Sequence, residues 1–139
     1  MSTPDGIPAE APVRDVVSIR LPASGVYLAV LRTTTASLAA RLDFTLDEIE
    51  DLRIAVDEAS ALLIAGAVEG ADLTSVFEMS TDSIHISVST MTAEGSQAAP
   101  RDSFAWTVLS ALAGEVDAWT DPDGRQTISL VKHRSRDAT

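Results

Sequence analysis

Apolar and polar residues alternate in five short segments of the chain, with the period of two that is typical of β-strands. These segments are residues 15–21, 72–80, 83–90, 115–119 and 127–133. In three longer segments apolar residues recur every three to four positions, which predicts helices after Ser24, from Thr45 to about Val68, and from about Ser103. The order β, α, α, β, β, α, β, β predicts an α+β fold, a two-layer sandwich of a mostly antiparallel sheet with about three helices on one face.

The starts of the helices carry recognisable signals. Thr45 to Glu48 reads Thr-Leu-Asp-Glu, a capping box with acids in the first turn, where the helix dipole favours negative charge. Ser24 is a plausible N-cap for the first helix. In the third helix, the predicted buried stripe is Phe104, Val108, Leu109 and Leu112.

The second predicted helix is apolar on two sides. One stripe, expected to face the sheet, consists of Ile49, Leu52, Val56, Ala59 and Leu63. The other consists of Ile54, Glu58, Ala61, Leu62 and Ala65. Because both sides are apolar, we expect both to be covered, by protein or by a ligand, with Glu58 at the margin of a pocket or under another element. The residues alone leave two roles open for Glu58: a cap or salt bridge within the fold, or a place in a ligand or catalytic site.

Composition places the chain among single-domain globular proteins. Its 139 residues are 45% hydrophobic, so we expect one domain over residues 15–133. The proline-containing segment 1–14 is expected to be a flexible arm and 134–139 a flexible tail. The chain lacks a run of about 20 apolar residues and a cationic, apolar leader, which predicts a cytoplasmic protein without a membrane partner.

Charge and residue usage exclude several kinds of chemistry. The chain has 10 basic and 21 acidic residues, a formal charge of −11, so direct binding of nucleic acid is not expected. Such a charge either keeps a small domain soluble or suits a basic partner. With no cysteine and only His85 and His133 as histidines, the sequence predicts no metal site and no thiol chemistry.

The segment DLRIAVDEASALLIAGA, residues 51–67, resembles the signature helix of the GHKL (histidine-kinase-like) ATPases, most closely that of the RsbW and SpoIIAB anti-sigma factors. The similarity extends without a gap to residues 31–59 and continues at SFAWTVLSALAGEVDAW, residues 103–119. It implies a GHKL (Bergerat-like) fold, an anti-sigma factor in a stress-response partner switch, and a kinase of a STAS-domain antagonist. Family members commonly dimerise, so the resemblance also allows a homodimer.

The chain departs from this family where ATP would bind. Glu58 matches the family's general base, but Leu62 stands where the family has its magnesium-binding asparagine, and a hydrocarbon cannot replace an oxygen ligand. The family's Asp-x-Gly-x-Gly motif is replaced by STMTAEGSQ, in which Glu94 is the only acid, and its lid glycines by RDSFAW. Three features of the ATP site are therefore missing together. Glu58 is expected to be a vestigial general base, and no residue is assigned to a cofactor.

The resemblance then leaves binding as the expected activity. We expect an anti-sigma factor without kinase activity, which sequesters an alternative sigma factor and is counteracted by a STAS-domain anti-anti-sigma factor. One alternative is an active ATP-dependent serine/threonine kinase that binds Mg·ATP weakly in a divergent pocket, where Arg101 or Arg125 could hold a phosphate. The other is an adaptor that binds only STAS or other regulatory proteins.

Four residues are expected to contact partners. Arg32 matches, by unbroken count from residues 51–67, the first-helix arginine that contacts partners in the family, although exposed helix arginines are common. Asp47, Glu50 and Asp51 belong to an acidic segment that holds one base, Arg53. Part of this charge serves the helix start, and the surplus could steer the chain to the basic DNA-contacting surfaces of a sigma factor.

Overall fold

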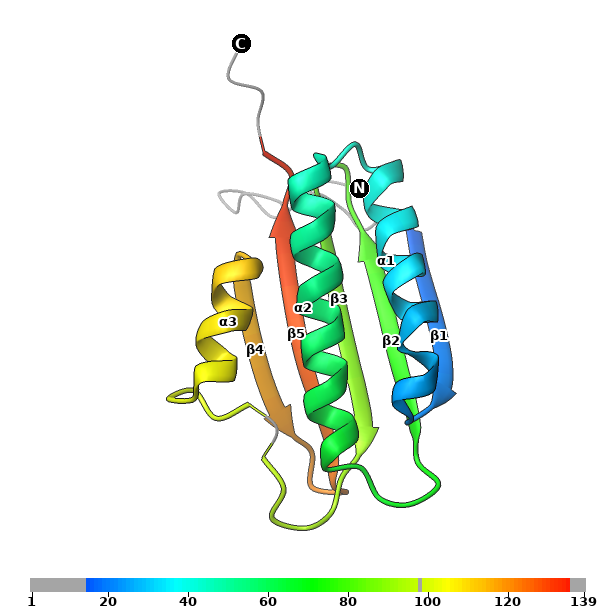
Figure 1. The fold of residues 1–139 in the computed structure, drawn as a ribbon, viewed down its shortest axis with the longest axis vertical. Helices are drawn as coiled ribbons and strands as arrows, with labels where there is room; N and C mark the ends of the chain where they lie inside the picture. The colour runs from blue at the N-terminus through cyan, green and yellow to red at the C-terminus, as the bar shows by residue number, and fades with distance from the viewer. Residues whose placement is uncertain (1–14, 98, 136–139) are drawn as a thin grey trace, which may run out of the picture.

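A computed structural model describes residues 15–97 and 99–135 of the chain. Figure 1 shows three α-helices lying side by side in front of a five-stranded sheet. In chain order the elements are β1 Asp15–Pro22, the 3-10 turn η1 Gly25–Tyr27, α1 Leu28–Arg41, α2 Leu46–Ala65, β2 Asp72–Met79, β3 Ser83–Met91, α3 Phe104–Leu112, β4 Glu115–Thr120 and β5 Arg125–His133. The predicted order and α+β class are confirmed.

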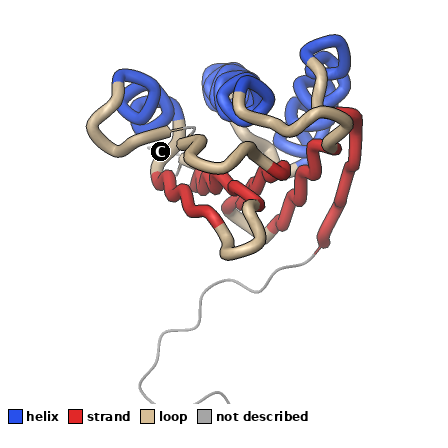
Figure 2. The backbone as a smooth tube through the Cα atoms, turned by 90° about the horizontal axis from the view of Figure 1, so that it is seen from below, coloured by secondary structure: helices blue, strands red, loops and turns tan. Residues whose placement is uncertain are grey.

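The sheet has the strand order β1-β2-β3-β5-β4, and every neighbouring pair is antiparallel. All three helices cover the same face, so the fold is a two-layer sandwich (Figure 2). Strand alternation sends one set of side chains into the core between the layers. Phe77 on β2, Ile86 on β3 and Ile128 on β5 are fully buried there, opposite Leu52 and Leu63 of α2. α2 thus lies over the middle of the sheet and anchors the helical layer.

The start of α2 has the predicted capping box. The Thr45 hydroxyl accepts a hydrogen bond from the Glu48 N–H at 3.1 Å, and the Thr45 N–H donates to Glu48 Oε1 at 2.8 Å. The helix ends at Ala65, three residues before the predicted end, because Gly66 begins a close contact with the loop after β3. A Cβ at Gly66 would lie 2.2 Å from Ser96 Oγ, so a larger residue there would have to displace the Ser96 side chain. This contact fixes the loop against the end of α2.

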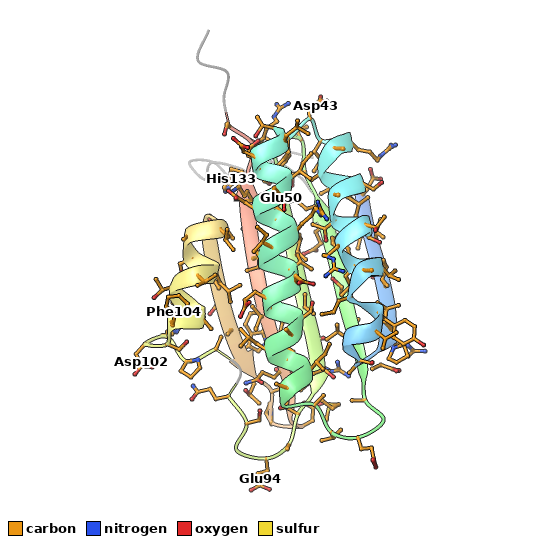
Figure 3. All side chains as sticks on the ribbon, in the orientation of Figure 1. Asp43, Glu50, Glu94, Asp102, Phe104 and His133 are labelled. Carbon is orange, nitrogen blue, oxygen red and sulfur yellow. The ribbon has the colours of Figure 1, made fainter. Side chains whose placement is uncertain are left out.

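Two local predictions need correction. Ser24 caps η1, whose Val26 N–H it accepts at 3.4 Å, and α1 itself begins at Leu28. Phe104, predicted to belong to the buried stripe of α3, is 83% exposed. Figure 3 shows its side chain on the outer side of α3, away from α2. The buried side of α3 centres on Leu109, and five residues of helix place Phe104 about 140° away from it.

Residues 1–14 and 136–139, most of the predicted arm and tail, lie outside the described residues. Ser135, which the sequence assigned to the tail, hydrogen bonds with Glu48 of α2. Among the helices in the described part of the chain, none is both long enough and apolar enough to span a bilayer.

Candidate functional site

The outward face of α2 carries the residues that the sequence singled out. Ile54, Ala61 and Ala65 are exposed on it, and Glu58 and Leu62 are half-buried. The described part of the chain therefore does not itself cover this face, and its cover by a ligand or a partner stays a prediction. α1 and α3 flank α2 in a single layer, and within residues 15–97 and 99–135 no element lies over the outer surface of α2 (Figure 2).

Leu62 lies on the flank of α2 that faces α3. At 100° per residue it is on the same side as Asp51, whose carboxylate reaches Lys132 Nζ at 3.3 Å. The same ammonium donates to the carbonyl of Leu112, the last residue of α3, at 2.8 Å. From this flank Leu62 packs against the hydrophobic core. The position one turn after Glu58 is thus filled by a hydrocarbon side chain that contributes to packing.

The loop between β3 and α3 is held by specific contacts with its surroundings. The Ala93 N–H donates to the carbonyl of Gly66 at 2.9 Å, and Ala67 pairs with Thr92 in an isolated bridge. Further along the loop, Arg101 pairs with Asp117 of β4 at 2.6 Å. Ser103 then caps α3, accepting a hydrogen bond from the Trp106 N–H at 3.2 Å. Side chains and backbone contacts thus occupy a segment that would need bare backbone N–H groups to cradle phosphates.

Both arginines that sequence reasoning offered for a phosphate are engaged within the fold. Arg101 pairs with Asp117, and Arg125 donates to the Ser89 hydroxyl at 3.3 Å. Leu62 thus offers a magnesium ion no oxygen ligand, and both arginines already have partners within the fold. Glu58 remains as a half-buried carboxylate beside Leu62, without an oxygen ligand one turn beyond it.

Arg32, the predicted partner-binding arginine, forms an ion pair that joins α1 to α2. Its guanidinium lies 2.8 Å from the carboxylate of Asp57, and both side chains are partly exposed. Sequence reasoning missed Asp57, because the two residues are 25 positions apart and no local pattern links them. The pair lies at the surface between the two helices, where a partner could compete for either charge.

The three predicted acidic contact residues differ in their surroundings. Asp47 and Glu50 are exposed near the start of α2, and Glu50 pairs with Arg53 at 2.9 Å. Asp51 is half-buried and holds Lys132, whose side chain is only 16% exposed. Asp51 therefore links α2 to the last strand, while Asp47 and Glu50 are available to a partner. Lys132 is the second residue that sequence reasoning missed.

Glu48 is a buried carboxylate at the same end of α2. Its Oε2 accepts hydrogen bonds from both the N–H and the hydroxyl of Ser135, in addition to the capping-box bond with Thr45. Burial acts to raise the pKa of Glu48, but the hydrogen bonds from Ser135 and Thr45 outweigh it and hold the pKa below its ordinary value of 4.5. The charged carboxylate thus ties the segment after β5 to the start of α2.

Glu48→Gln is expected to lower the free energy of unfolding at neutral pH by removing a contribution that depends on pH. Because the folded-state pKa is lowered, the carboxylate stabilises the fold above the unfolded-state pKa near 4.5, and this contribution is lost as the pH falls through the folded-state value. Urea unfolding between about pH 7 and pH 3 should show the wild type losing its advantage over the variant below that point. An advantage that stays constant over the range would contradict this role.

In sequence, the chain is similar to bacterial proteins named RsbW. No family model matches it. It is 38% identical over 99 residues to the anti-sigma-F factor RsbW of Mycobacterium tuberculosis, a match that covers 71% of this chain and 57% of that protein. It is 34% identical over 74 residues to the serine-protein kinase RsbW of Bacillus cereus, covering 52% of this chain and 46% of that protein. The chain thus spans about half the length of these curated relatives.

A solved structure supports the fold. The crystal structure of the RsbU and RsbW domains of Rv1364c from Mycobacterium tuberculosis matches with a TM-score of 0.70 and 18% sequence identity. The match covers 90% of this chain and 34% of that one. At this identity the likeness concerns the arrangement of helices and strands, which is shared along nearly the whole chain.

Proposed function

We propose that this chain, a relative of the RsbW proteins in sequence and in fold, is a cytoplasmic protein that sequesters an alternative sigma factor by direct binding. A STAS-domain protein competes for it and releases the sigma factor, as part of a stress-response partner switch. The chain does this without transferring phosphate. The observation that carries the last statement is Leu62, packed against the core where the resemblance calls for a magnesium ligand.

A relative's name and an exposed acidic surface support sigma-factor binding. The Mycobacterium tuberculosis relative is named an anti-sigma-F factor. The exposed start of α2 offers Asp47 and Glu50, and sigma factors need basic surfaces to contact DNA. An acidic surface that meets those basic residues attracts the sigma factor and competes with DNA for it. The adaptor alternative, binding only STAS or other regulatory proteins, uses the same surface with a different partner.

A kinase remains the second candidate, and two observations favour it. Glu58 is retained and only half-buried, and the Bacillus cereus relative is named a serine-protein kinase. Against it, the reaction needs a magnesium ligand and a phosphate cradle, and the residues at those positions are Leu62 and a loop with one glycine, Gly95. We therefore infer that the scaffold is kept for binding.

Titration of the wild type and of Leu62→Asn with Mg·ATP separates the sigma-factor binder from the kinase. In the wild type we expect no saturable heat on titration with micromolar Mg·ATP, and the same result in the variant, since one amide does not rebuild the loop. Because Leu62 is half-buried against the core, its replacement by a polar amide should lower the free energy of unfolding by about 1–2 kcal/mol. Calorimetric titration and urea unfolding measure the two effects.

The matched control is Ala61→Asn, on the neighbouring exposed position, which introduces the same amide at a cost of about 0.5 kcal/mol. Micromolar binding of Mg·ATP by the wild type, together with phosphate transfer to a STAS protein, would overturn the proposal. Gain of nucleotide affinity from Leu62→Asn alone would show that the site lacks only its metal ligand.

A further inference from the structure

A second region of the molecule, separate from Glu58 and Leu62, has the features of a small ligand site. A cavity of about 160 Å³ lies where the loop before α3 meets α3, β4 and β5. We call it the tryptophan pocket, and it is lined by Gln97, Ala99, Arg101, Trp106, Ala118, Trp119, Thr120 and Gln126. Two of the elements that line it, α3 and β4, lie at one edge of the fold in Figure 1. Its volume suits a molecule of about one ring.

Gln126, which lines the tryptophan pocket, has a buried polar atom without a hydrogen-bond partner. Gln126 is only 4% exposed, and its Nε2 donates to the carbonyl of Ser96 at 3.4 Å and to the Thr120 hydroxyl at 3.3 Å. A backbone carbonyl only accepts hydrogen bonds, so the amide must direct its nitrogen toward Ser96. This orientation leaves the Gln126 carbonyl oxygen, Oε1, buried and unpaired.

An unpaired buried acceptor destabilises a fold, and native structures keep few of them. A leucine or methionine at position 126 would fill the same space without that penalty. A water molecule or a ligand in the pocket would supply the hydrogen bond that this oxygen lacks. Because Oε1 is buried, the Gln126 amide has to rotate for this oxygen to meet an N–H donor in the pocket, and the two bonds that hold its Nε2 are long.

The other lining residues indicate that this partner is neutral. Arg101 is the only charged residue among them, and its guanidinium lies 4.5 Å above the ring of Trp106. Its charge is matched by Asp117 at 2.6 Å. Hydrogen bonds from Arg101 and from the Ala118 N–H hold the pKa of Asp117 below its ordinary value, so this carboxylate stays ionised at neutral pH. The pocket offers no unmatched charge to an ion.

We propose that the tryptophan pocket binds a small, neutral, planar molecule with an N–H donor, such as a carboxamide on an aromatic ring. The ring packs against the residues that line the cavity, and its N–H group donates to Gln126 Oε1. Ligand sites usually combine aromatic side chains with a few polar groups that orient the ligand, and the lining of this pocket has both. This site does not depend on sigma-factor binding, since none of its lining residues belongs to α1 or α2.

Benzamide is a suitable probe, because it combines one ring with one N–H-donating amide. The chain contains only two tryptophans, Trp106 and Trp119, and both line the pocket, so intrinsic tryptophan fluorescence reports on it directly. We expect a saturable change in fluorescence with a Kd of about 1 mM, typical of so small a ligand. N,N-dimethylbenzamide, which lacks the N–H donor, should bind about five- to tenfold more weakly.

Two variants test the site within the chain. Gln126→Met removes the acceptor and should abolish the preference for benzamide over N,N-dimethylbenzamide, with thermal unfolding confirming that the variant is folded. Ala118→Leu fills the cavity without altering Gln126 and should weaken benzamide binding at least tenfold. Ala111→Leu, on an exposed position of α3 outside the pocket, is its matched control and should bind as the wild type does.

The proposal is overturned if benzamide causes no saturable change in the wild type, which would mean that the cavity holds only water. It is also overturned if Ala118→Leu binds benzamide as tightly as Ala111→Leu does. Equal affinity of the wild type for benzamide and N,N-dimethylbenzamide would contradict the proposed hydrogen bond from the ligand to Gln126 Oε1.

Discussion

Phe77→Ala is expected to lower the free energy of unfolding by about 3–5 kcal/mol. Phe77 is fully buried at the centre of β2, where it pairs with Val17 of β1 on one side and Ile86 of β3 on the other. Truncation removes the ring from the core beneath the helices and leaves a cavity that the two flanking strands cannot close. Urea unfolding followed by far-UV circular dichroism measures the loss.

Phe104→Ala provides a control of the same chemistry. Phe104 is 83% exposed on the outer side of α3, so its truncation should change the free energy of unfolding by less than about 0.5 kcal/mol. Similar losses for the two variants would mean that Phe104 is buried in solution and that the placement of α3 is incorrect.

Asp47→Asn combined with Glu50→Gln is expected to slow association with the cognate sigma factor by about three- to tenfold at low salt. Both acids are exposed near the start of α2, and Figure 3 shows the labelled Glu50 at the same end of the molecule as Asp43. Their charges attract a basic partner over a distance that salt shortens. Stopped-flow association rates at about 20 mM and 500 mM salt should therefore converge for wild type and variant at the higher concentration.

The matched control also removes two negative charges, but at the other end of the molecule. Glu94→Gln with Asp102→Asn changes exposed acids that Figure 3 places beyond the lower ends of α2 and α3. The net charge of this variant equals that of the first, so any difference in rate comes from position. If both pairs slow association equally, or neither does, the start of α2 is not the surface that steers the partner.

Asp51 is left out of this variant for a structural reason. Its carboxylate is the ion-pair partner of Lys132, which is mostly buried and also holds the end of α3. Removing one member of such a pair leaves the other charge uncompensated, which destabilises the fold. A slower association of an Asp51 variant could then result either from the lost charge or from the disturbed fold.

Local patterns were enough to predict the elements of this fold. The capping box at Thr45 located the start of α2, and alternation located all five strands, because both signals depend on residues close together in the chain. The phase of α3 was harder to predict. Its nine residues are mostly apolar, so sequence could not tell which side of the helix would meet the sheet, and Phe104 was assigned to the wrong side.

The candidate site was only partly predictable for the same physical reason. Arg32 and Asp57 are 25 residues apart, and Asp51 and Lys132 are 81 apart, so only the folded chain shows these ion pairs. The exposure of the outer face of α2 depends on how far α1 and α3 extend over it. Gln126 gave no signal in sequence, because an unpaired amide is recognised only once its neighbours are in place.

Affinity purification from the native host tests most directly whether the chain binds a sigma factor and does not act as a kinase. The tagged chain is purified with and without Mg·ATP, and the bound proteins are quantified by mass spectrometry. The account predicts an alternative sigma factor in near-stoichiometric amount, retained equally in both conditions. Recovery of a STAS-domain or other regulatory protein with no sigma factor in either condition would contradict it.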